Sequence, residues 1–307
     1  MSDFSNPIFH DETKAREWLE ARVWPNGPVC PKCGVVGQAT LMKGKSHRAG
    51  LYQCNACREP FTVTVGTLYE RSKVPLHKWL GVTHLMMASK KGMSALQISR
   101  LIGLSYKTTW FLCHRIRESL RDDAAALPPM GGANKVVEAD ETYVGGKAKN
   151  RAYKEPAPKK PVLSLIERGG HVRSFHIANV GSKSIKPLIA ANVEKATMLM
   201  TDEATVYPSI AKDYASHGTV NHSANEYARL AGFVHINTAE SFFSLFKRGI
   251  VGSFHHVSEA HLHRYLGEFD FRWNTRKMTD AERMHLSIGG IVGKRLTYRR
   301  IGEAQAS

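Results

Sequence analysis

The 307-residue chain lacks any apolar run long enough to cross a lipid bilayer. Its first residues, MSDFSNPIFHDETK, also lack a basic segment followed by an apolar one, so no secretory signal is expected. Both absences predict a cytoplasmic protein that has no membrane partner.

Acidic residues are few for a chain of this size. The sequence contains 27 Asp and Glu against 43 Lys and Arg, which gives a net charge of +16 and a pI near 9.7. This excess favours a polyanionic partner, with nucleic acid ahead of an anionic membrane surface. A generally basic protein without such a partner would have the same composition. Hydrophobic residues make up 42% and charged residues 23%, which is typical of a folded chain rather than a disordered one.

Cysteine is also scarce, and four of the five cysteines form two CxxC pairs. Cys30 and Cys33 are the first pair, and Cys54 and Cys57 follow after 20 residues. In a reducing compartment we expect metal ligands or free thiols rather than disulfides, and four thiolates at this spacing predict one tetrahedral zinc ion in a zinc ribbon. Four cysteines leave no open coordination position, so the zinc should be structural. Cys113 is expected to be a small core residue.

Two serines in helix-capping positions, Ser94 and Ser105, predict a pair of short helices. One helix runs from Ser94 to Leu101, and the second runs from Ser105 to about Leu120, with a turn at Gly103 between them. This is the spacing of a helix-turn-helix, although many helical hairpins share it and bind nothing. The residues of the second helix expected to contact DNA are Lys107, Thr108, Arg115 and Arg117.

After a Pro-, Gly- and Ala-rich linker, the pattern changes to strands and helices in the order β-β-β-α-β-α-β-α. This order predicts an α/β domain with a mixed sheet flanked by helices. The loop at residues 145–160 has six Lys or Arg and one Glu, so it is either a phosphate-binding loop or a solubilising surface loop. Its expected DNA contacts are Lys147, Lys149 and Arg151.

Three carboxylates lie at the ends of rigid elements. Asp140 and Asp202 each follow an apolar stretch of strand, and Glu240 lies near the start of a predicted helix at residues 235–252. Oxygen ligands of this kind suit Mg²⁺, or Mn²⁺, and two such ions would support an in-line displacement at a phosphate. Each acid alone would be a surface or capping residue. Glu138, on the same strand face as Asp140, is a candidate auxiliary ligand.

The helix at residues 235–252 has two faces. Phe242, Leu245 and Phe246 form an apolar stripe that should face a core. The opposite, polar face consists of Asn237, Glu240, Ser244 and Lys247. In isolation this polar face reads as an ordinary solvated surface, and only partners elsewhere in the chain would give it a function.

Several runs match one known family in order: VEADETYVGGK, TDEATVY, VNHSANEY, HINTAESFFSLFKRGIVGSFHHVS and YLGEFDFRWNTR. They resemble bacterial insertion-sequence transposases of the Merlin-related, ISXO2-like group, which have an N-terminal zinc ribbon and a ribonuclease H-like DDE core. The resemblance implies that Asp140 and Asp202 are metal ligands. It also implies Mg²⁺-dependent cleavage of transposon ends and transfer of the 3′-hydroxyls to target DNA. Double-stranded DNA, as terminal inverted repeats and target, would be the partner, and pairing two ends requires at least a dimer.

The third metal ligand is open, because the group carries Asn or Glu there and both Asn237 and Glu240 fit the HxNxxE pattern. A carboxylate is the better ligand for a hard cation, which favours Glu240. Lys247 matches the family's downstream basic residue, which is expected to grip phosphate, and Arg248 is a further expected DNA contact. The alternative functions are an inert zinc-ribbon and helix-turn-helix regulator, and a DNA endonuclease without strand transfer.

The predicted architecture is an α/β catalytic core, with a ribonuclease H-like mixed sheet flanked by helices, preceded by a small zinc ribbon and a helix-turn-helix. The expected segments are an amphipathic helix (residues 1–28), the zinc ribbon (29–70), the helix-turn-helix domain (72–122), a linker (123–134), the catalytic domain (135–277) and a basic C-terminal tail (278–307).

Overall fold

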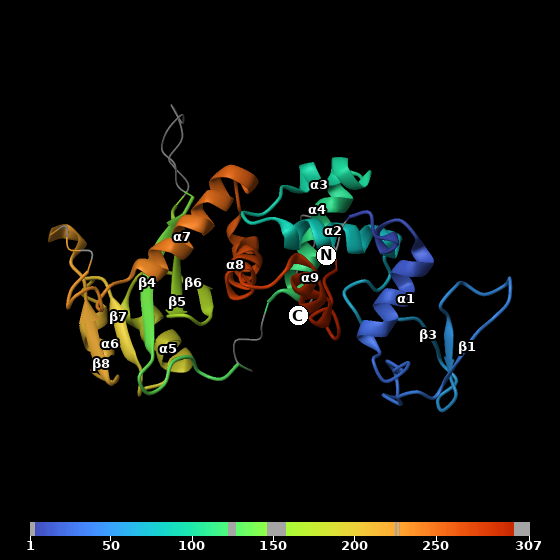
Figure 1. The fold of residues 1–307 in the computed structure, drawn as a ribbon, viewed down its shortest axis with the longest axis horizontal. Coiled ribbons are helices and arrows are strands. Elements are labelled where there is room, and N and C mark those ends of the chain that lie inside the picture. Colours follow the sequence, from blue (N-terminus) through green and yellow to red (C-terminus); the bar gives the residue numbers. More distant parts are fainter. Residues whose placement is uncertain (1–3, 122–126, 146–157, 225, 227, 298–307) are drawn as a thin grey trace. The chain divides into compact units, whose positions relative to one another are not determined.

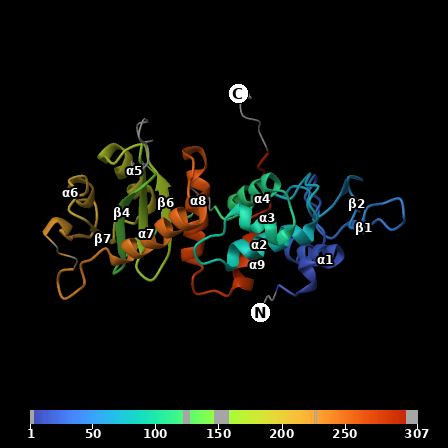
Figure 2. The same cartoon turned by 90° about the horizontal axis from the view of Figure 1, so that it is seen from above.

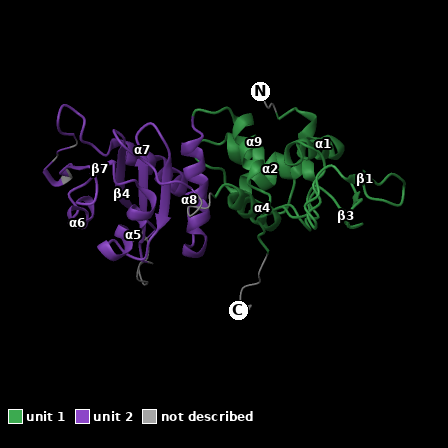
Figure 3. Ribbon diagram, turned by 90° about the horizontal axis from the view of Figure 1, so that it is seen from below, with its two compact units in different colours: residues 1–121, 277–307 green, residues 122–276 purple. Residues whose placement is uncertain are grey.

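The structure is a computed structural model in which the chain divides into two compact units (Figure 3). Unit 1 combines residues 1–121 with residues 277–307, and unit 2 spans residues 122–276. The predicted DNA contacts Lys147, Lys149 and Arg151 lie outside the described residues. The structure describes residues 4–121, 127–145, 158–224, 226 and 228–297.

Unit 1 begins with a short 3-10 helix, η1 (Pro7–Phe9), and helix α1 (Glu12–Val23). A three-stranded antiparallel sheet of β1 (Ala39–Leu41), β2 (Tyr52–Cys54) and β3 (Pro60–Phe61) follows. Its core is aromatic, because the ring of Trp24 contacts those of Tyr52 and Phe61 edge-on at centroid distances of 5.4 and 5.6 Å. So small a core depends on a further cross-link for its stability, and the cysteine pairs are placed to supply one.

Three helices follow the ribbon: α2 (Leu76–Ala88), α3 (Ala95–Ile102) and α4 (Tyr106–Ser119). Ser94 and Ser105 cap α3 and α4 as the sequence predicts, since each Oγ accepts a backbone N–H bond of 3.2 Å from within the first turn. Gly103 ends α3 with a φ of 67°, a left-handed conformation that favours glycine. The predicted pair of helices is confirmed; DNA binding by this pair stays a prediction.

Residues after 277 do not form the expected basic tail throughout. Helix α9 (Asp280–Gly289) begins with a capping box, in which Thr279 Oγ1 accepts from the Glu282 N–H and the Glu282 carboxylate accepts from the Thr279 N–H at 2.7 Å. Arg283 Nη1 donates to the Met87 carbonyl of α2 at 3.2 Å. Met284 and Ile288 are buried. This helix is therefore part of the core of unit 1.

Unit 2 is built on one five-stranded sheet in the order β6-β5-β4-β7-β8 (Figure 1). The first three strands in this order pair antiparallel, whereas β4, β7 and β8 pair parallel. The central strand β4 therefore has one antiparallel and one parallel neighbour, which confirms the predicted mixed sheet. The strands are β4 (Val136–Val144), β5 (Lys160–Glu167), β6 (Val172–His176), β7 (Met198–Thr201) and β8 (Ser216–Thr219).

Helices cover both faces of this sheet (Figure 2). Alternation along β4 sends Val137 and Ala139 into the core beneath α5 and α6, while Val144 packs with α7 and α8 on the other face. By the same alternation, the side chains of Glu138 and Asp140 leave β4 on the face of the sheet that α7 covers, and the side chain of Glu141 leaves it on the face that α6 covers. The remaining elements are α5 (Ser182–Asn192), α6 (Tyr207–Ala211), η2 (His222–Ala224), α7 (Asn237–Gly249), the π-helical turn η3 (Ile250–Phe254) and α8 (Glu259–Asn274).

Candidate active site

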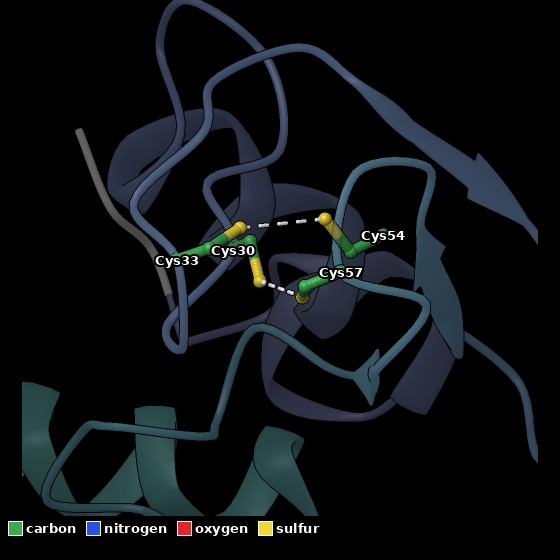
Figure 4. A group of neighbouring side chains, drawn as sticks. All are labelled: Cys30, Cys33, Cys54 and Cys57. Atoms are coloured by element: carbon green, nitrogen blue, oxygen red, sulfur yellow. Dashed lines mark hydrogen bonds between the residues drawn. The ribbon is translucent and has the colours of Figure 1, made fainter.

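Four cysteines of unit 1 converge from two tight turns (Figure 4). The Sγ atoms of Cys30 and Cys57 are 3.6 Å apart, as are those of Cys33 and Cys54, and all four lie within 4.8 Å of one another. Tetrahedral zinc with Zn–S bonds of about 2.3 Å places its sulfurs ~3.8 Å apart. The cluster is thus arranged for one zinc ion, as the sequence predicts.

The thiols of this cluster have unequal acidities. A backbone hydrogen bond from Cys33 is the main cause that lowers the pKa of Cys30 to about 6. A backbone hydrogen bond from Glu59 also lowers that of Cys57, but burial and the three neighbouring thiols outweigh it and raise the pKa of Cys57 to about 12. The sulfurs are too close for all four to ionise without a cation between them.

Three carboxylates of unit 2 form a second compact group. Oxygens of Asp140, Glu141 and Asp202 all lie within 4.8 Å of one another, and each side chain is half-buried. The parallel pairing of β4 and β7 explains the meeting of the two aspartates: Glu138 lies opposite Met200, so the same register two residues further sets Asp140 beside Asp202.

Backbone hydrogen bonds orient both aspartates. Asp140 Oδ1 accepts from the N–H of Glu141 at 2.8 Å. Asp202 Oδ1 accepts from the N–H of Ala204 at 3.0 Å, which turns the chain directly after β7. Asp202 directly follows β7, as the sequence predicts, whereas Asp140 lies in the middle of β4, which continues to Val144, so the expectation that Asp140 closes its strand is wrong. The two carboxylates still meet, because β4 extends past the end of its parallel neighbour β7.

Glu141 is the member of this group that the sequence analysis missed. It adjoins Asp140 on a strand, where successive side chains point to opposite faces, so the pattern gave no reason to pair them. The hydroxyl of Tyr207, on α6, donates a hydrogen bond to Glu141 Oε1. Burial, with a smaller contribution from the charges of Asp140 and Asp202, raises the pKa of Glu141 to about 7. Such crowding of negative charge favours a bound cation.

Helix α7 is anchored to the same strand through Glu138. This side chain is fully buried, and its carboxylate accepts hydrogen bonds from the N–H groups of Thr238 and Ala239, at 2.9 and 3.0 Å, and from Thr238 Oγ1 at 2.9 Å. The residue before the helix, Ile236, provides no side-chain cap. Glu138 therefore supplies from β4 the negative cap that the helix lacks locally.

Arg168 completes this anchor. Its Nε donates to Glu138 Oε1 at 2.6 Å, and its two terminal nitrogens donate to the carbonyls of Phe233 and His235 at 2.7 and 2.8 Å. The ion pair thus binds the start of α7 and the segment leading into it. The sequence suggests Glu138 as an auxiliary metal ligand, but both of its carboxylate oxygens accept hydrogen bonds from α7 or Arg168.

The two faces predicted for α7 are observed. Phe242 and Phe246 are fully buried, and Leu245 is partly buried against the same core. The polar residues Asn237, Glu240, Ser244 and Lys247 are exposed. Among the described residues, the compact carboxylate group contains Glu141 and does not include Glu240. Its role as third ligand, like that of Asn237, stays a prediction.

Of the four DNA contacts expected on α4, two lie in its accessible first turn and two are buried. Lys107 is exposed and Thr108 is half-buried in the first turn, where a ligand can reach them. Arg117 is only 2% exposed, so its burial corrects the expectation that it meets phosphates. Arg115 is 7% exposed and donates to the Glu70 carbonyl at 3.0 Å. On α7, both Lys247 and Arg248 are exposed.

None of the described helices combines the length and apolar character needed to cross a bilayer. The mixed sheet is covered by helices and carries one aspartate within β4 and a second directly after β7, which defines a ribonuclease H-like core. The cysteine cluster defines a zinc ribbon ahead of it.

Comparison with known proteins agrees with this class. Residues 131–274 match the ISXO2-like transposase domain, and residues 10–59 match the transposase zinc-ribbon domain. The chain is 30% identical over 281 residues to a protein in the transposable element ISH50 of Halobacterium salinarum, a match that covers 86% of this chain and 91% of that protein. The chain belongs to the ISXO2-like transposase family, which confirms the resemblance seen in the sequence.

Proposed function

We propose that this transposase cuts the ends of an insertion sequence and joins the resulting 3′-hydroxyls to target DNA by Mg²⁺-dependent, two-metal phosphoryl transfer. The observation that carries the proposal is the convergence of Asp140, Glu141 and Asp202 at the edge of the sheet. The net charge of +16 supplies the matching attraction for a polyanionic substrate.

The donor set fits a hard divalent cation. Three carboxylates converge within 4.8 Å. Burial first, and then the charges of Asp140 and Asp202, raise the pKa of Glu141 to about 7, and a bound cation would offset this unfavourable crowding of negative charge. Asp140 and Asp202 would hold the ion, with Glu141 beside them and Tyr207 fixing its carboxylate. When bound, Mg²⁺ or Mn²⁺ supplies a more acidic water or 3′-hydroxyl and charge stabilisation at the leaving oxygen.

Cleavage and joining are the same displacement at phosphorus with different attacking groups, and the chain's own residues position the DNA for both. In cleavage, water forms a bond to phosphorus as the bond to the 3′-oxygen breaks, leaving a 3′-hydroxyl and a 5′-phosphate. In joining, that 3′-hydroxyl forms the new bond and the target strand's own 3′-oxygen leaves. Lys247 and Arg248, exposed on α7, would bind phosphate near the site, and either Glu240 or Asn237 would complete the ligands.

We assign a structural role to zinc in the ribbon, because all four coordination positions are taken by cysteine. The DNA partners are the terminal inverted repeats and the target duplex, contacted by Lys107 and Thr108 in unit 1 and by the loop containing Lys147, Lys149 and Arg151. Pairing of two ends requires at least two copies of the chain.

The test uses purified protein, a labelled duplex carrying the element's own end, a supercoiled target plasmid and Mg²⁺. Asp140→Asn and Asp202→Asn should each reduce cleavage and joining by roughly a thousandfold, equivalent to about 4 kcal/mol of lost transition-state stabilisation. Asp213→Asn is the matched control, since Asp213 is half-exposed and lies 3.6 Å from Lys186. It should retain full activity.

The outcomes separate the alternatives. Cleaved ends without joined product identify an endonuclease. Binding without cleavage in Mg²⁺ and in Mn²⁺ identifies an inert DNA-binding regulator. Full activity in either aspartate variant means that the assignment of that residue is wrong.

A further inference from the structure

A basic pocket lies in unit 1, outside the carboxylate site. It has a volume of about 390 Å³ and is formed by residues 71–74, before α2, and by the first turns of α4. Its lining contains no Asp or Glu within the described part of the chain. The apolar wall includes Phe111 and Leu112, and the cations that line it are Arg71, Lys73, Lys107 and Arg115.

Arg115 is the unusual member of this lining. It is only 7% exposed, and its guanidinium lies over the rings of Trp79 and Phe111 at 5.1 and 5.8 Å. One terminal nitrogen donates to the Glu70 carbonyl, but Nε has no acceptor among the described residues. A guanidinium stays charged at all physiological pH values. Burying it with a donor unused is costly unless an anion completes its hydrogen bonds.

The start of α4 adds to the positive potential of the pocket. Lys107 and Thr108, both in the lining, belong to the first turn of this 14-residue helix, where backbone N–H groups carry partial positive charge. Of the charges outside the lining that act on Arg115, Arg295 is positive and Glu70 is negative. An anion in the pocket would meet charge from side chains and from the helix end together.

The size and lining of the pocket indicate what kind of anion it takes. A water molecule needs roughly 10–15 Å³ of such space, so about 390 Å³ holds far more than a free phosphate ion. The wall of Phe111 and Leu112 offers contact to an apolar group attached to that anion. A deoxyribose-phosphate has both parts: a charged phosphate and a largely apolar sugar face.

We infer that this pocket binds one sugar-phosphate unit of the DNA backbone, with the phosphate on Arg115, Lys73 and Lys107 and the sugar against Phe111. The inference rests on the proposed function, because it takes DNA as the ligand. A backbone contact at this point fixes the orientation of α4 on the duplex and reads no base sequence.

The test measures DNA binding by the full chain, without divalent metal, by fluorescence anisotropy between about 50 and 200 mM salt. Two labelled duplexes serve as probes, one with the element's end and one of unrelated sequence. The variants are Lys107→Gln and Lys73→Gln. Lys14→Gln is the control, because Lys14 is an exposed lysine of the same unit, on α1, outside the pocket.

Each pocket variant should lower the slope of log affinity against log salt by about 0.9, which is about an eightfold loss of affinity at 100 mM salt. The loss should be equal for both duplexes, and Lys14→Gln should behave as wild type. Arg115→Lys should weaken binding too, but Arg115 packs on Trp79, so this variant also needs an unfolding measurement and the two lysines carry the test.

The results separate a failure of the pocket inference from a failure of the proposed function. If the wild-type protein binds neither duplex, the proposed function fails. If it binds both and the two lysine variants keep its affinity and slope, only the pocket inference is overturned. If, in that case, calorimetry shows that millimolar inorganic phosphate binds the wild type but not Lys107→Gln, the pocket is a free-phosphate site that DNA does not use, and the inference is wrong.

Discussion

Replacing Glu138 by glutamine tests how α7 is held beside the carboxylate site. Glu138→Gln keeps the shape of the side chain and removes its charge. The amide still accepts hydrogen bonds through its oxygen, but its NH₂ group then faces the donors of Thr238, Ala239 or Arg168. Arg168 loses the partner of a buried ion pair.

The size of the effect follows from the burial of this pair. Removing one member of a fully buried ion pair costs about 3–5 kcal/mol. The side chain of Arg168 is 20% exposed and keeps its bonds to two carbonyls, so we expect the lower end, ~3 kcal/mol. For a unit of this size, that lowers the unfolding temperature by about 6–12 °C.

Urea unfolding followed by circular dichroism measures the loss of stability, and the cleavage assay at a temperature where the variant is still folded measures the effect on the site. Activity should fall further than the folded fraction, because α7 carries Asn237, Glu240 and Lys247. Glu259→Gln is the control: Glu259 is 62% exposed on α8, and its loss should change stability by no more than about 0.5 kcal/mol. Unchanged stability and activity in Glu138→Gln would refute the anchoring role.

Three further predictions concern the site and the ribbon. Tyr207→Phe removes the hydrogen bond to the Glu141 carboxylate and should lower the free energy of unfolding by about 1.5–3 kcal/mol. Titration calorimetry should also show weaker Mg²⁺ binding, and unchanged Mg²⁺ affinity would contradict a role for the tyrosine in the site. Glu240→Gln and Asn237→Ala, compared in the cleavage assay, should differ by at least tenfold, and the larger loss identifies the third ligand; equal, full activity in both would exclude α7 from metal binding. Metal analysis should find about one zinc per chain, and a strong chelator should abolish the near-UV circular dichroism of the ribbon aromatics; folded, zinc-free protein would disprove a structural metal.

Local rules account for the elements that the sequence predicts well. The caps at Ser94 and Ser105 depend only on neighbouring backbone, so their positions can be read from the chain. Asp202 was predictable because it follows a buried strand, whereas Asp140 meets it from the middle of β4 and not from a strand end. The same kind of local signal, the capping box from Thr279 to Glu282, marked α9, but the surrounding basic composition hid it.

The remaining features depend on contacts between distant residues. Glu141 joins the site through Tyr207 and the turn after Asp202, which strand alternation does not reveal. The burial of Arg115 follows from its contacts with Trp79 and Glu70, 36 and 45 residues earlier, whereas composition alone made it resemble a surface cation.

The return of the chain to unit 1 sets an order for its synthesis. The N–H of Leu68 donates to the Ile291 carbonyl, and a Cβ at Gly290 would lie 2.1 Å from the Ser119 carbonyl oxygen, so the segment around α9 fits closely against residues made much earlier. The ribosome must finish all of unit 2 before α9 emerges to complete unit 1. A prematurely terminated chain would therefore retain the cysteine cluster but lack the helix that packs against α2, and unit 1 would remain incomplete.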